Sequence, residues 1–248
     1  MKRLTPSCLI VVALAFLLPV FARAADGEIT EAMVQQRLTK GQELAAGGFP
    51  AQALTEYLWC YDEGFPAVPR LRALRTTVLV GMIKRLARDN GDAEIALGKR
   101  CDEAEKRLLA GDEGAAMEFS ALCDALGSEK RLLKVFDKIP AGDPRRHGFG
   151  LPGVTALLGK KRYADAASAM SFEAMLRVTQ EQFAHVPPNA EEDDPRHDAA
   201  VTQALDFIEV LAGAKDQAHA DEIIAKLKTF DASGTTKRDI EKRLKRAG

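Results

Sequence analysis

Apolar residues recur through most of this chain three and four positions apart, the spacing that places them on one face of an α-helix. The clearest stripe has steps of 4, 4, 3 and 4 and comprises Ala93, Leu97, Cys101, Ala104 and Leu108. The one compact β-branched run, residues 76–80, lies inside a stretch with helical periodicity. The predicted fold class is therefore all-α, with helices expected over residues 31–46, 50–64, 69–88, 92–110, 113–126, 128–138, 154–159, 163–185, 195–212, 216–230 and from 235 onward.

Residues that start and stop helices support these boundaries. Thr30 and Asp92 are good N-caps, Pro50 suits a first helical position, and Gly47-Gly48 ends the first helix. Four glycines and three prolines between residues 139 and 153 predict an irregular hinge. A Pro-rich, acidic linker is expected at residues 186–194. In the helix over 69–88 the residues predicted to face the core are Leu71, Leu74, Val78, Met82, Ile83 and Leu86.

The first helix pair also carries a repeat-like pattern of small and large residues. The pattern consists of Gly41, Leu44, Ala53, Tyr57 and Cys60. Residues 48–57 (GFPAQALTEY) resemble the turn and second helix of a tetratricopeptide repeat, residues 161–167 (KRYADAA) are similar to a second such junction, and a fainter third lies at 220–224. Arg37 and Lys40 stand where that family has Trp and Leu, and residues 68–138 show no clear 34-residue register.

This resemblance implies antiparallel helix pairs stacked as a tetratricopeptide-like α-α superhelix with a curved inner surface. Helices approach closely where a side chain is small, so Gly41, Ala53 and Ala166 are expected to lie against neighbouring helices. One repeat cannot bury its apolar stripe alone, so the mature chain is expected to form a single helical-repeat domain over residues 25–248.

The first 24 residues have the pattern of a secretory signal peptide. A basic start (Met1-Lys2-Arg3) precedes an apolar run over residues 8–21 and a small-x-small site at 22–24. The alternative is an uncleaved membrane anchor, but the run is shorter than the roughly 20 residues that a bilayer span needs. We therefore expect export to the periplasm or the extracellular space, with no stable membrane insertion after cleavage.

The net charge of the chain limits the classes of partner that it is expected to bind. The whole chain has a formal net charge of −1 from 35 basic and 36 acidic residues. Removing residues 1–24 takes away Lys2, Arg3 and Arg23 and leaves a net charge of −4. Nucleic-acid binding needs a basic surface that displaces phosphate counterions, so a nucleic-acid partner is not expected.

Three cysteines remain after cleavage: Cys60, Cys101 and Cys123. Cys101 and Cys123 are each 11 residues from Asp112, so a helical hairpin turning there sets them opposite one another. They are a candidate disulfide, and the alternative is a pair of small buried thiols. No Cys-x-x-Cys motif or helical His pair accompanies them, so no metal site is predicted.

Two groups of residues are candidate binding residues. Trp59 and Tyr61 are aromatic residues of the second helix; Trp59 lies off the apolar stripe, so the next helix covers it or a partner does. Arg145, Arg146 and His147 precede a predicted helix start, where guanidinium groups and free amides favour a carboxylate or phosphate. The alternative for this cluster is an uncommitted, solvated loop.

Motifs for catalysis and cofactors are weak. Residues 148–153 match G-x-G-x-x-G, but no strand precedes them and Pro152 removes one amide, so an inter-repeat turn is the better interpretation. Four adjacent acids at 191–194 lack the alternating ligand spacing of calcium loops. The four histidines of the chain are scattered, and no catalytic residue and no cofactor is predicted.

Three hypotheses for the function follow. The first is an exported, non-enzymatic helical-repeat scaffold that binds a protein or peptide. The second is a cell-envelope enzyme, or its helical accessory domain, in the manner of superhelical cell-wall lytic enzymes, which requires a deep cleft holding a carboxylate. The third is a carrier whose apolar ligand occupies a closed cavity lined by Leu71, Val78 and Phe119.

Overall fold

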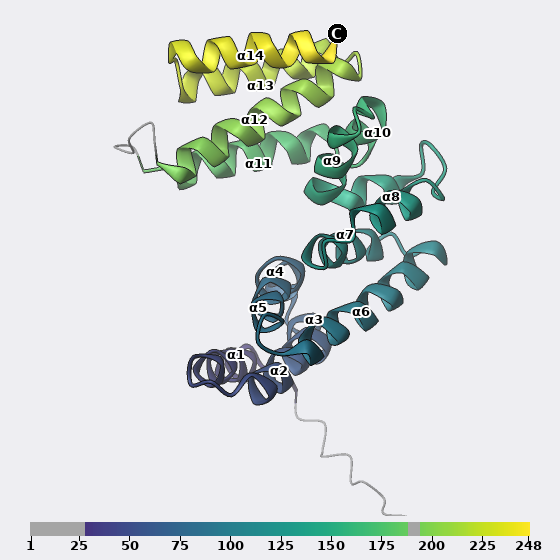
Figure 1. Ribbon diagram of the computed structural model, residues 1–248, viewed down its shortest axis with the longest axis vertical. Coiled ribbons are helices and arrows are strands. Elements are labelled where there is room, and N and C mark those ends of the chain that lie inside the picture. Colours follow the sequence, from purple (N-terminus) through teal and green to yellow (C-terminus); the bar gives the residue numbers. More distant parts are fainter. Residues whose placement is uncertain (1–27, 188–193) are drawn as a thin grey trace, which may run out of the picture.

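The computed structural model describes residues 28–187 and 194–248, and over these residues the protein is all-α without a β-strand. This confirms the predicted fold class. The segment expected to be a signal peptide lies outside the described residues, as does most of the acidic linker. Figure 1 shows the helices arranged along an arc, with α1 (Glu31–Ala46) at one end of the long axis and α14 (Gly234–Ala247) at the other.

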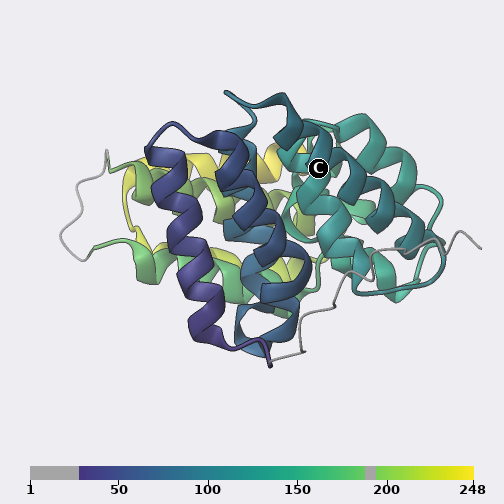
Figure 2. The same ribbon diagram turned by 90° about the horizontal axis from the view of Figure 1, so that it is seen from below.

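The first helix pair has the predicted starts and close packing, but its second helix ends at Trp59, five residues before the predicted end. The Thr30 hydroxyl caps α1 by accepting from the backbone N–H of Met33, and α2 (Pro50–Trp59) starts at the expected proline. A Cβ added to Gly41 would lie 2.6 Å from a ring carbon of Tyr57, so glycine is what lets these helices approach. The two helices lie side by side in Figure 2. Ala53 on α2 is fully buried, as expected.

Two π-helical turns interrupt the next part of the chain. The first, η1 (Cys60–Gly64), continues α2 and leads into the short α3 (Phe65–Ala67). The helix expected over residues 69–88 is divided into four segments instead of one. These segments are a 3-10 turn η2 (Pro69–Leu71), α4 (Arg72–Leu74), the π turn η3 (Arg75–Leu79) and α5 (Val80–Leu86).

The second π turn changes which residues face the core. Leu74 and Val78 were predicted to point inward, but they are 40% and 41% exposed, whereas Leu79 and Val80 are buried. A π turn closes its hydrogen bonds one residue later than an α turn, so an apolar stripe does not keep α-helical spacing across it. Ile83 and Leu86 beyond the turn are buried as predicted.

Helices α6 (Gly91–Leu109) and α7 (Ala115–Ala125) form the predicted antiparallel hairpin. Every residue of the predicted α6 stripe is buried. Asn90, not Asp92, caps α6: its side chain accepts from the Asp92 N–H at 3.0 Å.

The region predicted as an irregular hinge is shorter and better packed than expected. After α8 (Glu129–Phe136), a 3-10 segment η4 (Pro144–Phe149) leads directly into α9 (Gly150–Gly159), which starts four residues before the predicted position. Phe149 is fully buried, and its carbonyl accepts from the Ser120 hydroxyl at 2.6 Å. Gly150 has a φ of 57°, which a glycine adopts without strain.

The helix expected over 163–185 is two helices. The first is α10 (Tyr163–Ser168), and the second is α11 (Phe172–His185), which is capped by the Ser171 hydroxyl. Ser171 is a good N-cap residue, but the apolar pattern continues without a break on both sides of it. The sequence therefore predicted one helix where there are two. Ala166 on α10 is fully buried, as predicted.

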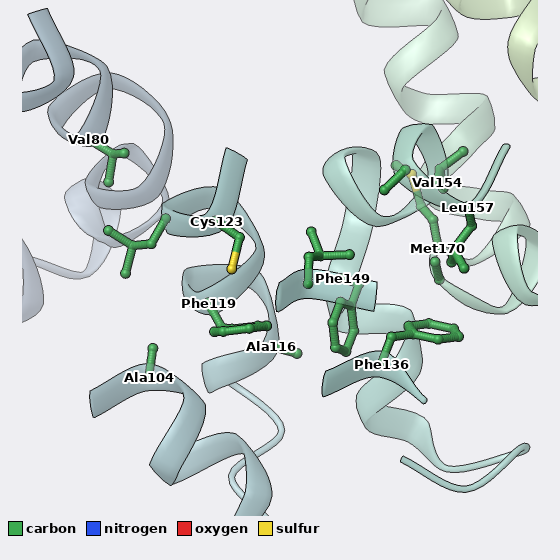
Figure 3. Packing of buried hydrophobic residues seen from close by; sticks show 14 of the residues in the cluster. Val80, Ala104, Ala116, Phe119, Cys123, Phe136, Phe149, Val154, Leu157 and Met170 are labelled. Atoms are coloured by element: carbon green, nitrogen blue, oxygen red, sulfur yellow. The ribbon is translucent and has the colours of Figure 1, made fainter. Parts of the chain in front are cut away.

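The chain ends in α12 (Pro195–Gly213), α13 (Gln217–Phe230) and α14, close to the predicted boundaries. A Cβ added to Gly213 would lie 2.3 Å from Cγ of Tyr163, so α10 and α12 approach as closely as α1 and α2. The buried apolar side chains form one connected cluster that extends from Val34 to Ile240. Figure 3 shows its middle, where Phe149 meets Phe119 and Phe136 edge to face.

Candidate functional site

A pocket of about 450 Å³ opens between α3, the α4–η3 segment and the first turn of α7. The backbones of these elements converge near the middle of the arc in Figure 1. The pocket combines apolar side chains with two guanidinium groups and one carboxylate, and it is lined by Pro66, Arg72, Ala73, Arg75, Thr76, Gly114, Met117 and Glu118.

Glu118 forms the inner wall of this pocket, and its carboxylate is held by three protein donors. The residue is 4% exposed. The Tyr61 hydroxyl donates to Oε1 at 2.6 Å, and the guanidinium groups of Arg75 and Arg107 both pair with Oε2. Buried charges are tolerated when they are paired and hydrogen-bonded, and this carboxylate meets that condition.

Tyr61, a residue predicted to take part in binding, lies behind the pocket wall. It is 2% exposed, and the Arg75 and Arg100 guanidinium carbons lie 4.8 and 5.4 Å from its ring centre. Burial raises the pKa of the Tyr61 hydroxyl, and the nearby charge of Glu118 raises it further. Tyr61 therefore acts as a fixed hydrogen-bond donor that positions Glu118 and does not reach a ligand itself.

Both π turns contribute to this cluster. Tyr61 lies in η1, and Arg75 lies in η3. π turns lie frequently at functional sites, because the inserted residue redirects the side chains around it. Arg75 and Glu118 were not predicted as site residues, because an arginine and a glutamate next to apolar stripes give no local signal that they will meet in the fold.

A second cluster of the same type shows that part of this arrangement is structural. Glu209 on α12 is 1% exposed, pairs with Arg243 and Arg246 of α14, and accepts from the Tyr163 hydroxyl at 3.3 Å. Each cluster therefore joins helices around one buried glutamate. The Glu118 cluster, in addition, lines a pocket.

The pocket has an excess of positive charge. Arg72 and Arg75 line it with one carboxylate, Glu118. The Arg72 Nε donates to the Pro66 carbonyl at 2.9 Å, and within the described part of the chain no carboxylate lies within ion-pair distance of its guanidinium group. The pocket therefore offers a guanidinium group to an anionic ligand.

Trp59 does not line this pocket. Its ring is covered from α1, where the Arg37 guanidinium carbon lies 4.2 Å from the ring centre. A Cβ added to Gly64 would also lie 3.0 Å from the Trp59 ring. The contacts over the ring thus come from the preceding helix and the π turn, not from the next helix as expected.

Arg145, Arg146 and His147 lie together in η4, and none of the three lines the pocket. Arg145 binds Asp143 and donates to the Leu108 carbonyl at 2.9 Å. Arg146 is buried and binds the Ile139 carbonyl and Asp165, whereas His147 is exposed. Protein acceptors therefore engage both arginines, which fasten η4 to its neighbours.

The structure places the two candidate disulfide cysteines opposite one another. Their sulfur atoms are 3.7 Å apart, and both residues are fully buried free thiols. The hydrogen bond between the two thiols lowers the pKa of Cys101. The same hydrogen bond raises the pKa of Cys123, and burial raises it further. Cys60 is separate: its sulfur lies 3.9 Å from the Val34 carbonyl, and burial raises its pKa to about 11.

In residues 28–187 and 194–248, no group of three or more His, Cys, Asp or Glu side chains has the arrangement of a metal site. No helix in that part of the chain has the length and apolar character needed to cross a bilayer. Residues 191–193 of the acidic run lie outside the described residues.

Two histidines of the described residues have acidic neighbours. His219 lies 2.7 Å from Asp216, and His197 lies 3.8 Å from Asp231.

No protein-family model, curated protein or solved structure matches the chain.

Proposed function

We propose that this protein is an exported, non-enzymatic helical-repeat scaffold that binds a protein or peptide partner through the pocket beside Glu118. The observation that carries the proposal is the pocket itself. It is open, about 450 Å³ in volume, and lined by Met117, Pro66 and Ala73 together with two guanidinium groups. Recognition sites commonly combine apolar contact area with a few fixed polar groups, as this pocket does.

The scaffold in this proposal is a tetratricopeptide-like superhelix. Its support is the repeated use of a glycine against a tyrosine where helices cross, at Gly41–Tyr57 and at Gly213–Tyr163. Tyr57 lies in the first segment that resembles a tetratricopeptide junction, and Tyr163 lies in the second. In such a scaffold each helix pair packs on the next and leaves a curved face for a partner.

The occupant that the pocket suits best is a peptide segment with an acidic group and an apolar side chain. The acidic group would pair with Arg72, whose guanidinium group borders the opening. The apolar side chain would contact Met117, which is 54% exposed although it is large and apolar. Such complementary pairing contributes to specificity as well as to affinity.

Two features favour binding over the other two functions. Both oxygens of Glu118 are taken by protein donors, which favours a structural carboxylate over one that exchanges protons with a substrate. Val78 is exposed and Phe119 is fully buried beside Phe149, so these residues do not enclose one apolar cavity with Leu71. A carrier built on those three residues is therefore disfavoured.

Export is part of the same proposal and rests on the sequence of residues 1–24. A basic start, an apolar run and a small-x-small site together form the pattern of a cleaved signal. The partner is accordingly expected in the periplasm or outside the cell. N-terminal sequencing of the exported protein tests this part, with Ala25 as the expected first residue.

A peptide-display selection on the purified protein tests the binding function. We expect it to enrich peptides that carry Asp or Glu beside an apolar residue. Fluorescence polarisation of a selected peptide should then show at least a tenfold loss of affinity for Arg72→Gln and for Met117→Glu, about 1.4 kcal/mol each.

Arg88→Gln is the matched control, because it removes the same charge from an exposed residue that does not line the pocket. It should bind the peptide as the unmodified protein does. Selection of no peptide, or affinities that the two pocket substitutions leave unchanged, would contradict the proposed function.

A further inference from the structure

The α6–α7 hairpin holds two cysteines with their sulfur atoms in van der Waals contact. Cys101 and Cys123 lie 22 residues apart in the chain, and their sulfur atoms are 3.7 Å apart. Both belong to apolar stripes that face each other, and each side chain is fully buried. The pair therefore meets as a consequence of the hairpin itself.

The surroundings of the pair permit a covalent bond. A disulfide brings two sulfurs to about 2.05 Å and joins Cα atoms that lie within about 7 Å, so the helices must pack closely. Small side chains allow this: Ala104 on α6 and Ala115 on α7 are fully buried in the same core. Figure 3 shows Cys123 on α7 within this core, with Ala104 on the adjacent helix.

We propose that Cys101 and Cys123 form a disulfide when the protein folds in the presence of a disulfide oxidant, and that Cys60 remains a thiol. Cys60 lies in η1, and its sulfur contacts the Val34 carbonyl of α1. The inference concerns the fold and does not depend on the proposed function. It gives the α6–α7 hairpin, which carries Arg107 and Glu118, a covalent link.

The reaction is thiol–disulfide exchange with an oxidant that is itself a disulfide, such as glutathione disulfide or a disulfide-bearing folding enzyme. The thiolate of one cysteine attacks the oxidant, forms a mixed disulfide and releases one oxidant thiol. The second cysteine loses its proton and attacks that mixed disulfide, which releases the second thiol. The two protein thiols together lose two protons and two electrons, and the oxidant is reduced to two thiols.

Burial determines when the exchange takes place. Neither side chain is exposed in the folded protein, so an oxidant reaches them while the hairpin is still open, during folding. The folded, reduced protein should accordingly react slowly with a thiol reagent at both positions. The test therefore compares protein refolded with and without glutathione disulfide, and alkylates the remaining thiols in denaturant.

Tryptic peptides separate the cysteines cleanly. Cys101 falls in residues 101–106, Cys123 in residues 108–130 and Cys60 in residues 41–70. We expect peptides 101–106 and 108–130 to be linked only after refolding with the oxidant, and Cys60 to be alkylated in both samples. Alkylation of both Cys101 and Cys123 after oxidative refolding, or a link that includes Cys60, would overturn the proposal.

Thermal unfolding supplies a second readout that does not depend on peptide recovery. Closing a loop of about 20 residues should raise the Tm of the oxidised protein by about 5–10 °C over the reduced protein. Cys60→Ala should keep this redox-dependent shift, whereas Cys101→Ala and Cys123→Ala should each abolish it. Equal Tm values for the oxidised and reduced unmodified protein would contradict a link in the folded state, even if a variant failed to fold.

Discussion

The hydroxyl of Tyr61 donates a 2.6 Å hydrogen bond to Oε1 of Glu118, a residue 57 positions further along the chain. The bond joins the π turn after α2 to the first turn of α7, and the pocket opens beside it. Arg75 completes the cluster from the second π turn. The wall of the pocket is therefore fixed by contacts between segments that are distant in sequence.

Replacing Tyr61 with phenylalanine should destabilise the protein by about 1–2 kcal/mol, because the buried Glu118 oxygen then loses its neutral donor. Urea unfolding measures this difference. Tyr57→Phe is the matched control: Tyr57 is also buried, but its hydroxyl makes no hydrogen bond to the described residues. If the two substitutions have the same effect, the Tyr61–Glu118 bond does not hold the pocket wall.

Stability should fall above pH 10, and Tyr61 should contribute to the fall. Burial raises the pKa of Tyr61 in the folded protein above the usual value of about 10, so the unfolded chain releases this proton first. The stabilisation is complete below pH 10 and is lost as the pH rises above it, by up to about 1.4 kcal/mol per pH unit. Urea unfolding at pH 9–11 should show a shallower loss for Tyr61→Phe than for the unmodified protein. Equal slopes would contradict this assignment.

Alanine at the two close helix crossings should be poorly tolerated. In Gly41→Ala and Gly213→Ala the new Cβ would lie 2.6 and 2.3 Å from the rings of Tyr57 and Tyr163, so we expect each substitution to cost about 1–3 kcal/mol. Gly98→Ala is the control, because no atom lies within 4 Å of its added Cβ inside α6. It should be neutral or stabilising by up to about 1 kcal/mol. Thermal unfolding of the three variants measures these differences in stability. Equal changes in Tm for all three would show that the helices do not approach closely at Gly41 and Gly213.

The all-α fold could be predicted because its signals are local. Thr30, Pro50 and the Gly47-Gly48 pair mark helix ends through backbone chemistry that does not depend on the rest of the molecule. The position of the hydrophobic face at η3 could not be predicted. Two apolar faces are possible there, one with Leu74 and Val78 and one with Leu79 and Ile83. Tertiary packing buries the second face and leaves the first exposed.

The candidate site was predicted only in part, for the same reason. Tyr61 was singled out as an aromatic residue, but its partner Glu118 lies on another helix, next to the buried Phe119. Arg145 and Arg146 were predicted as an anion-binding cluster because they are adjacent in the sequence. In the structure they form ion pairs with Asp143 and Asp165 of the same chain. Charge clusters in a sequence do not show which acidic residues will meet them after folding.

Hydrogen–deuterium exchange with and without a selected peptide tests most directly whether a partner binds at the pocket beside Glu118. Because the pocket is bordered by α3, the α4–η3 segment and the start of α7, the account predicts slower exchange over residues 66–79 and 114–118. Exchange in α13 should not change. Protection confined to the C-terminal helices, or no protection anywhere at saturating peptide, would contradict it.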